Sequence, residues 1–152
     1  MQRGESKLSQ HPIDALVREA IRAKQAVADD VVGRVIERMA TVPFPTVASH
    51  LERHAQIGAQ WTNATTDEHY LADLRRAIRD PNAQLAIYFR RRGYLSAVVA
   101  ETRRIVPSER RGTNSLPLLF VLYSADRGII VTGYQCSGIG RLNLPEDVRW
   151  LK

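Results

Sequence analysis

The chain has 152 residues, 44% of them hydrophobic and 25% charged, which predicts one globular domain large enough to bury a core. It has no stretch of about 18 apolar residues, so the sequence predicts no membrane span, and the single Cys136 excludes an internal disulfide. The net charge is +6, and residues 45–152 carry most of the excess, with fifteen Lys and Arg against ten Asp and Glu.

The first predicted element is helical and covers residues 12–41. Apolar side chains recur there mostly at steps of three and four residues, which predicts one long or two shorter amphipathic helices. This part is nearly neutral and holds no cluster of catalytic residue types. We therefore interpret residues 1–44 as an N-terminal helical extension that packs on the rest or binds a partner. Pro43 and Pro45 stop the helix and mark the boundary between this extension and the rest of the chain. We predict that residues 45–152 form the unit that carries the biochemical function.

Two further helices are predicted before the strands begin. The first runs over about 46–60 and holds both His50 and His54. The second begins at Thr66, because a threonine followed by two acidic residues is typical of a helix N-cap, and it ends before Pro81.

After Pro81 the apolar pattern changes to alternation, rich in β-branched and aromatic residues. We predict a strand in each of four segments, 83–93, 94–107, 116–126 and 128–136. Between the last two, the sequence SADRGI is a hairpin turn in which Gly128 is free to take a positive φ, and residues 107–117 form a longer basic loop. Helices first and a meandering sheet afterwards predict an α+β fold with an antiparallel sheet of about four strands.

A known zinc signature places two histidines four residues apart on one helix face together with a glutamate. The sequence has a similar group in His50, Glu52 and His54. Here the glutamate lies midway between the histidines, and at about 100° per residue it points away from both imidazoles. No third ligand follows at a standard spacing. We therefore predict no metal and no other cofactor, and the histidines need another role.

The order of these features resembles the catalytic domain of colicin D and the wider superfamily of small metal-independent ribonuclease toxins that includes barnase-like folds. The similarity covers residues 48–137 and rests on a helix with LERHAQIG, a second helix with YLADLRRAI and a strand with GIIVTGYQ. In colicin D a histidine just before an apolar-Gly pair acts on tRNA, and His54 takes that position here. The later Ser-Gly-Trp of colicin D matches the tripeptide from Thr132 to Tyr134.

The resemblance implies cleavage of RNA by attack of the 2′-hydroxyl on the neighbouring phosphorus, which leaves a 2′,3′-cyclic phosphate. His54 would transfer the proton, because the unperturbed pKa of histidine, about 6.5, populates both protonation states near neutrality. Thr132 would hydrogen-bond a phosphate oxygen and Tyr134 would stack on a base, and strand alternation puts both on one face. The family's basic residue three before the histidine is Leu51 here, so its role passes to Arg53 or to an arginine of the sheet.

Fourteen of the fifteen basic residues in 45–152 are arginine, whose planar guanidinium binds phosphate in a bidentate manner. We predict a substrate-binding set from these arginines and the first histidine of the helix: His50, Arg90, Arg91, Arg92 and Arg104. Each has a plainer interpretation, because an arginine run at a strand end and a histidine on an amphipathic helix are usually solvated. Threonine and tyrosine are also common strand formers.

We therefore predict a metal-independent endoribonuclease, a toxin effector that acts on RNA in the cytoplasm, with tRNA as a target class taken from the resemblance alone. The resemblance also allows delivery to a target cell as part of a larger effector. An acidic immunity or antitoxin protein is the expected protein partner. Two alternatives stay open. One is a non-catalytic nucleic-acid-binding module, which needs the arginines and not His54; the other is a structural or assembly protein that uses residues 12–41 as its interface.

Overall fold

A computed structural model describes residues 8–91 and 93–152 of the chain. The helices come first: α2 (Pro12–Ala23), α3 (Asp29–Thr41), α4 (Val47–Leu51), continued directly by the π-helix η1 (Glu52–Ile57), and α5 (Asp67–Arg79). The later part holds the strands β1 (Gln84–Arg90), β2 (Gly93–Glu101), β3 (Leu118–Ser124), β4 (Ile129–Cys136) and β5 (Arg149–Trp150). Three short helical turns lie between them: α6 (Thr102–Ile105), η2 (Ser108–Arg110) and η3 (Ile139–Leu142).

The strands form one sheet in the order β4-β3-β2-β1-β5, and every neighbouring pair is antiparallel. The predicted α+β order of helices followed by an antiparallel sheet is confirmed, and β5 is a fifth strand that the sequence did not reveal. The predicted strand over 94–107 was too long, because β2 ends at Glu101 and the chain turns into α6. Gly128 lies at φ 69 in the β3–β4 turn, as the hairpin prediction required.

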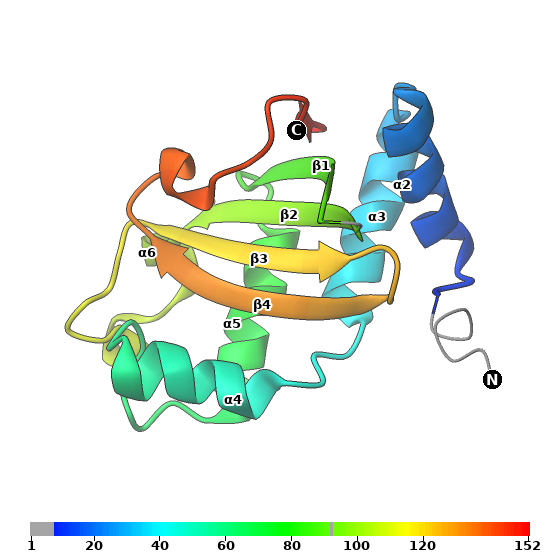
Figure 1. The fold of residues 1–152 in the computed structure, drawn as a ribbon. Coiled ribbons are helices and arrows are strands. Elements are labelled where there is room, and N and C mark those ends of the chain that lie inside the picture. The colour runs from blue at the N-terminus through cyan, green and yellow to red at the C-terminus, as the bar shows by residue number, and fades with distance from the viewer. Residues whose placement is uncertain (1–7, 92) are drawn as a thin grey trace.

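The sheet has an inner face covered by α2, α3 and α5 and an outer face that carries no long helix (Figure 1). The larger core lies on the inner face, where Met39, Leu74 and Ile78 are fully enclosed. Apolar residues of α2 and α3 belong to this same core, so the predicted N-terminal extension, where it is described, packs directly on the rest of the protein. The division of function at residue 44 stays a prediction.

A smaller core lies on the outer face. Tyr88, Val99 and Phe120 of the sheet pack beneath Leu142 and the chain that follows η3. None of the helices in the described ranges has the length and apolar content that crossing a membrane requires.

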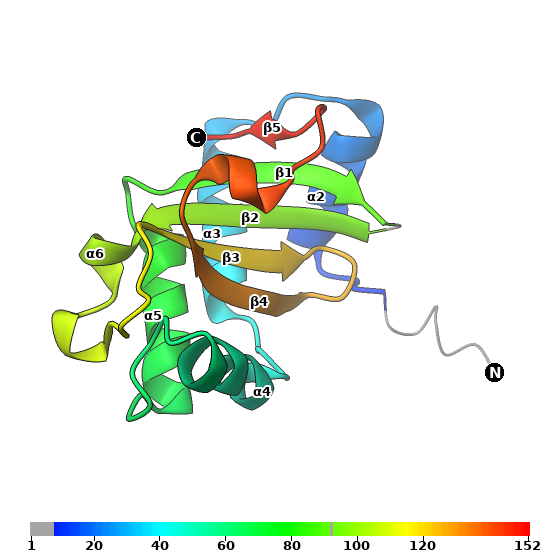
Figure 2. The ribbon, with the colours of Figure 1, turned by 60° about the vertical axis from the view of Figure 1, so that its left-hand side comes forward.

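Strand β4 is an edge of the sheet, and the α4–η1 helix lies along it in both ribbon views (Figures 1 and 2). The exposed N–H and C=O groups of an edge strand invite pairing with other chains. Gln60, just after η1, satisfies two such groups: its Nε2 donates to the carbonyl of Gln135 at 2.9 Å, and its Oε1 accepts from the N–H of Gln135 at 2.8 Å. These bonds fix the histidine-bearing helix against β4.

Candidate functional site

Both histidines of the α4–η1 helix face strand β4. His50 Nδ1 and Thr132 Oγ1 share a hydrogen bond of 3.1 Å, although the two residues are 82 apart in the chain. The ring of His54 stacks on that of Tyr134 with centroids 5.6 Å apart, and the two imidazole rings lie 5.9 Å from each other. The structure thus brings four of the predicted site residues into one group, which we call the histidine cluster: His50, His54, Thr132 and Tyr134.

The strand alternation that the sequence predicted is present in β4. Phe120 lies opposite Tyr134 in β3, with ring centroids 5.3 Å apart, on the outer face of the sheet. Gly133 faces the other way, because a Cβ atom built on it would lie 2.5 Å from the side chain of Leu74 in α5. Thr132 and Tyr134 therefore share the outer face, as a common site requires.

Enclosure of the two histidines lowers their affinity for protons. Burial, followed by the charges of His50 and Arg53, lowers the pKa of His54 from 6.5 to about 4. Partial burial and then Arg53 lower the pKa of His50 as well. Nε2 of His54 is enclosed and has no hydrogen-bond partner among the described residues. The expectation that His54 populates both protonation states near neutrality is therefore corrected: its ring is neutral at about pH 7.

Arg53 projects into solvent from η1, next to the histidine cluster. Its charge is close enough to contribute to the lowered pKa of both His50 and His54. Within the described part of the chain, its side chain has no hydrogen bond or ion pair. Its guanidinium is therefore able to bind an anion that approaches the cluster.

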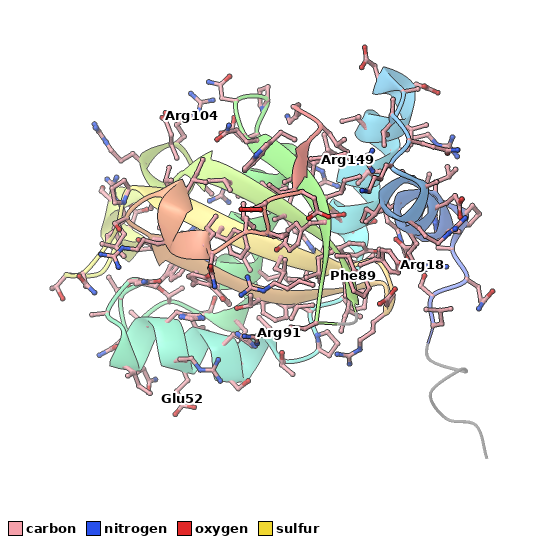
Figure 3. All side chains as sticks on the ribbon, turned by 45° about the horizontal axis from the view of Figure 1, so that its top comes forward. Arg18, Glu52, Phe89, Arg91, Arg104 and Arg149 are labelled. Atoms are coloured by element: carbon pink, nitrogen blue, oxygen red, sulfur yellow. The ribbon has the colours of Figure 1, made fainter. Side chains whose placement is uncertain are left out.

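The predicted phosphate-binding arginines do not form one patch. Arg90 ends β1 on the outer face, and its charge opposes the rise that burial causes in the pKa of Tyr134. Arg91 is exposed in the β1–β2 turn at φ 51, and Arg92 lies outside the described residues. Arg104 lies beyond the other end of β2, a strand of nine residues that spans about 30 Å, and Figure 3 shows it far from Arg91.

Buried carboxylates neutralise several of the arginines. Asp73 is fully buried and forms ion pairs with Arg76 and Arg110. Asp80 accepts hydrogen bonds of 3.1 and 2.9 Å from Arg104, and these bonds are the main reason that its pKa is lowered. Arg104, predicted to bind substrate, therefore has a structural partner, although its side chain stays 42% exposed.

The zinc signature is absent from the geometry as well as from the spacing. Glu52 is exposed and points away from the sheet (Figure 3), whereas His50 and His54 point towards β4. Among residues 8–91 and 93–152, no three His, Cys, Asp or Glu side chains lie close enough together to hold a metal ion.

Two arginines outside the predicted substrate-binding set line a hollow beside α6. Arg103 and Arg111 come together there with Arg104, because the loop over 107–117 folds back towards α6. No periodic pattern marks such a pair, since their proximity depends on tertiary contacts of the loop.

The chain was compared with family models, with curated proteins and with solved structures, and none of the three comparisons finds a significant match.

Proposed function

We propose that the protein is a metal-independent endoribonuclease whose active site is the histidine cluster, with Arg53 at its margin. The observation that supports this most strongly is the 3.1 Å contact of His50 with Thr132, beside the stack of His54 on Tyr134. An imidazole, a hydroxyl, an aromatic ring and a guanidinium are the groups that cleavage of RNA by its own 2′-hydroxyl would use.

In the proposed reaction His54 acts as the base. With a pKa of about 4 its ring is unprotonated near neutrality, so it has a lone pair to accept the proton of the 2′-hydroxyl. The 2′-oxygen then attacks the adjacent phosphorus and the bond from phosphorus to the 5′-oxygen breaks. The leaving 5′-oxygen takes a proton from water and His54 gives its proton back to solvent, so the products are a 2′,3′-cyclic phosphate and a 5′-hydroxyl. Thr132 and Arg53 would donate hydrogen bonds to the phosphate oxygens, and each such donor contributes about 3 kcal/mol to transition-state stabilisation.

Tyr134 would couple substrate binding to the exposure of this base. In the free protein its ring stacks on His54, whose Nε2 is enclosed. A nucleobase that stacks on Tyr134 in place of the imidazole would contribute about 1–3 kcal/mol and uncover Nε2.

The enclosure of His54 also favours a second candidate function, a non-catalytic RNA-binding module. Such a module would bind through Arg53 and Tyr134 and leave both imidazoles as packing groups. It differs from the ribonuclease in one observable, because it binds RNA without cutting it. The third alternative, an assembly protein that uses residues 12–41, has less support because the apolar faces of α2 and α3 pack into the protein's own core.

Incubation of the purified protein with total RNA in EDTA tests the proposal. The ribonuclease should release fragments with 2′,3′-cyclic phosphate and 5′-hydroxyl ends. His54→Ala should slow cleavage by about 10²–10⁴-fold, whereas His69→Ala, at an exposed position in the first turn of α5, should not change the rate. Cleavage that needs added metal would contradict the proposed mechanism, and binding without cleavage would support the module.

The proposed setting is a toxin effector that acts on RNA in the cytoplasm, with tRNA as one target class. A producer of such an enzyme has to mask it, and an acidic immunity or antitoxin protein would be attracted to the basic surface of residues 45–152. Co-expression with the neighbouring reading frame should then remove toxicity.

A further inference from the structure

A second basic site lies at the far end of β2 from the β1–β2 turn. A hollow of about 460 Å³ is lined by Glu101, Arg103, Arg104 and Arg111, and we call it the arginine hollow. Three guanidinium groups lie there with one carboxylate, so the hollow keeps a positive charge. Its lining comes from the end of β2, from α6 and from the loop over 107–117.

Two of these three guanidinium groups are available to a ligand. Arg104 is bound to Asp80 through two hydrogen bonds of 3.1 and 2.9 Å. Arg103 is exposed and Arg111 is half-buried, and neither side chain has a hydrogen bond or an ion pair with any residue that the structure describes. Guanidinium groups in this state can bind phosphate oxygens in a bidentate manner.

The loop over 107–117 holds Arg111 in place. The preceding Arg110 donates hydrogen bonds of 3.2 and 2.5 Å to the fully buried Asp73. Arg111 itself pairs with Trp61 through a short antiparallel bridge of the backbone. A cation on a fixed backbone loses less conformational entropy when it binds, so these contacts prepare the hollow for a ligand.

The same loop joins the arginine hollow to the histidine cluster. It lies against the segment directly after η1, where the N–H of Asn114 donates to the carbonyl of Ala59 at 2.8 Å. His54 lies about one helical turn before this segment. Figure 2 shows α6 and the loop on the same side of the molecule as the C-terminal end of the α4–η1 helix.

We infer that the arginine hollow binds phosphate groups of the same RNA strand that the histidine cluster acts on, away from the cleaved bond. A strand held at the cluster carries a further phosphate at every nucleotide, and those beyond the end of η1 come towards Arg103 and Arg111. Such contacts add affinity and fix the register of the strand without reading its sequence. The inference rests on the proposed function for the identity of the ligand, while binding in the hollow does not require cleavage.

The salt dependence of binding tests the hollow separately from the chemistry. The probe is a single-stranded 2′-O-methyl RNA, which has no free 2′-hydroxyl and so is bound without being cut. The double variant Arg103→Gln/Arg111→Gln removes the two available cations. It leaves Arg104 in place, because loss of that side chain would leave Asp80 without its partner. The matched control, Arg34→Gln/Arg127→Gln, removes two exposed arginines from other elements.

Each phosphate contact on a single strand contributes about 0.7 to the slope of log affinity against log salt. Between about 50 and 200 mM salt the wild type should therefore lose about sevenfold more affinity than the hollow variant, and the control should follow the wild type. Arg103→Gln alone should give about half of the change in slope, which provides a second measurement if the double variant unfolds. Equal slopes in the two double variants would overturn the inference. If the wild-type protein binds the probe but never cuts RNA, the proposed ribonuclease activity is contradicted, whereas the inference that the arginine hollow binds phosphate is not.

Discussion

Acidification should destabilise the protein through His54, and the size of the effect follows from its surroundings. Burial and the charges of His50 and Arg53 lower the pKa of this histidine from 6.5 to about 4. As the pH falls through 6.5 the unfolded chain takes up the proton first, so the stability present above that pH is lost progressively towards pH 4. The full shift corresponds to about 3 kcal/mol. Because the ring is partly solvated, we halve this to about 1.5 kcal/mol.

Urea unfolding at neutral pH and at about pH 4.5 measures the effect as a change in the free energy of unfolding. Over this interval His54→Gln should lose about 1.5 kcal/mol less stability than the wild type, because its side chain cannot take up a proton. His69→Gln, which replaces an exposed histidine, should behave as the wild type does. Equal losses in the wild type and His54→Gln would refute the reasoning, as would an NMR titration in which the His54 ring takes up its proton near the ordinary value.

Two substitutions test the packing that supports the site. Asp73→Asn should lower the free energy of unfolding by about 3 kcal/mol in urea, because Arg76 and Arg110 lose the buried carboxylate that neutralises them, and Asp67→Asn at the exposed start of α5 is the control. Gly33→Ala on the exposed side of α3 should raise it by about 1 kcal/mol, because the added methyl group meets nothing within 4 Å and alanine is the better helix former. A lower melting temperature of Gly33→Ala would contradict this account.

The elements that the sequence predicted well are those with a complete local signal. Helix α5 begins where expected because the hydroxyl of Thr66 accepts a hydrogen bond from the N–H of His69 at 3.1 Å, and the chain leaves it before Pro81. The apolar stripes of α2 and α3 and the alternation in β1, β3 and β4 are equally local.

The elements that the sequence missed are set by contacts from elsewhere in the chain. The segment over 102–105 follows a strand pattern, yet it is helical. The N–H of Thr102 donates to the carbonyl of Pro117 at 2.9 Å, and Arg76 donates to the carbonyl of Ile105 at 2.7 Å. Pro117 and Arg76 are both distant in sequence from this segment, so no local pattern predicts that it is helical. The π-helical form of η1 likewise has no signature in its spacing.

The candidate site also has one part that local sequence patterns predict and another part that depends on contacts between distant residues. Strand alternation was enough to place Thr132 and Tyr134 on one face, and the resemblance supplied the helix that meets them. Counting charges could not show which arginines are neutralised, because Asp80 lies 24 residues from Arg104 and Asp73 lies 37 from Arg110. Of the predicted site arginines, Arg53 and Arg91 stay without a partner in the described structure, whereas Arg90 and Arg104 donate hydrogen bonds to other residues.

Gly112 is the residue on which the placement of Arg111 depends. A Cβ atom there would lie 2.1 Å from the carbonyl oxygen of Ala59 and 2.8 Å from that of Trp61, and backbone atoms cannot turn aside as a side chain can. Gly112→Ala should therefore push the loop away from the chain after η1 and lower the free energy of unfolding by about 2–3 kcal/mol in urea. The affinity for the 2′-O-methyl RNA should fall in the same variant, because Arg111 moves with the loop.

Gly140→Ala is the matched control, since nothing lies within 4 Å of a Cβ atom at that position, and it should change neither quantity. The two measurements together separate packing from binding. The free energy of unfolding of Gly112→Ala could instead lie within about 0.5 kcal/mol of the wild-type value, which is usual for substitutions that meet no packing constraint. In that case the loop moves at little cost. Arg111 would then have no fixed place from which to bind a phosphate, and the arginine hollow would lose the rigidity on which its affinity depends.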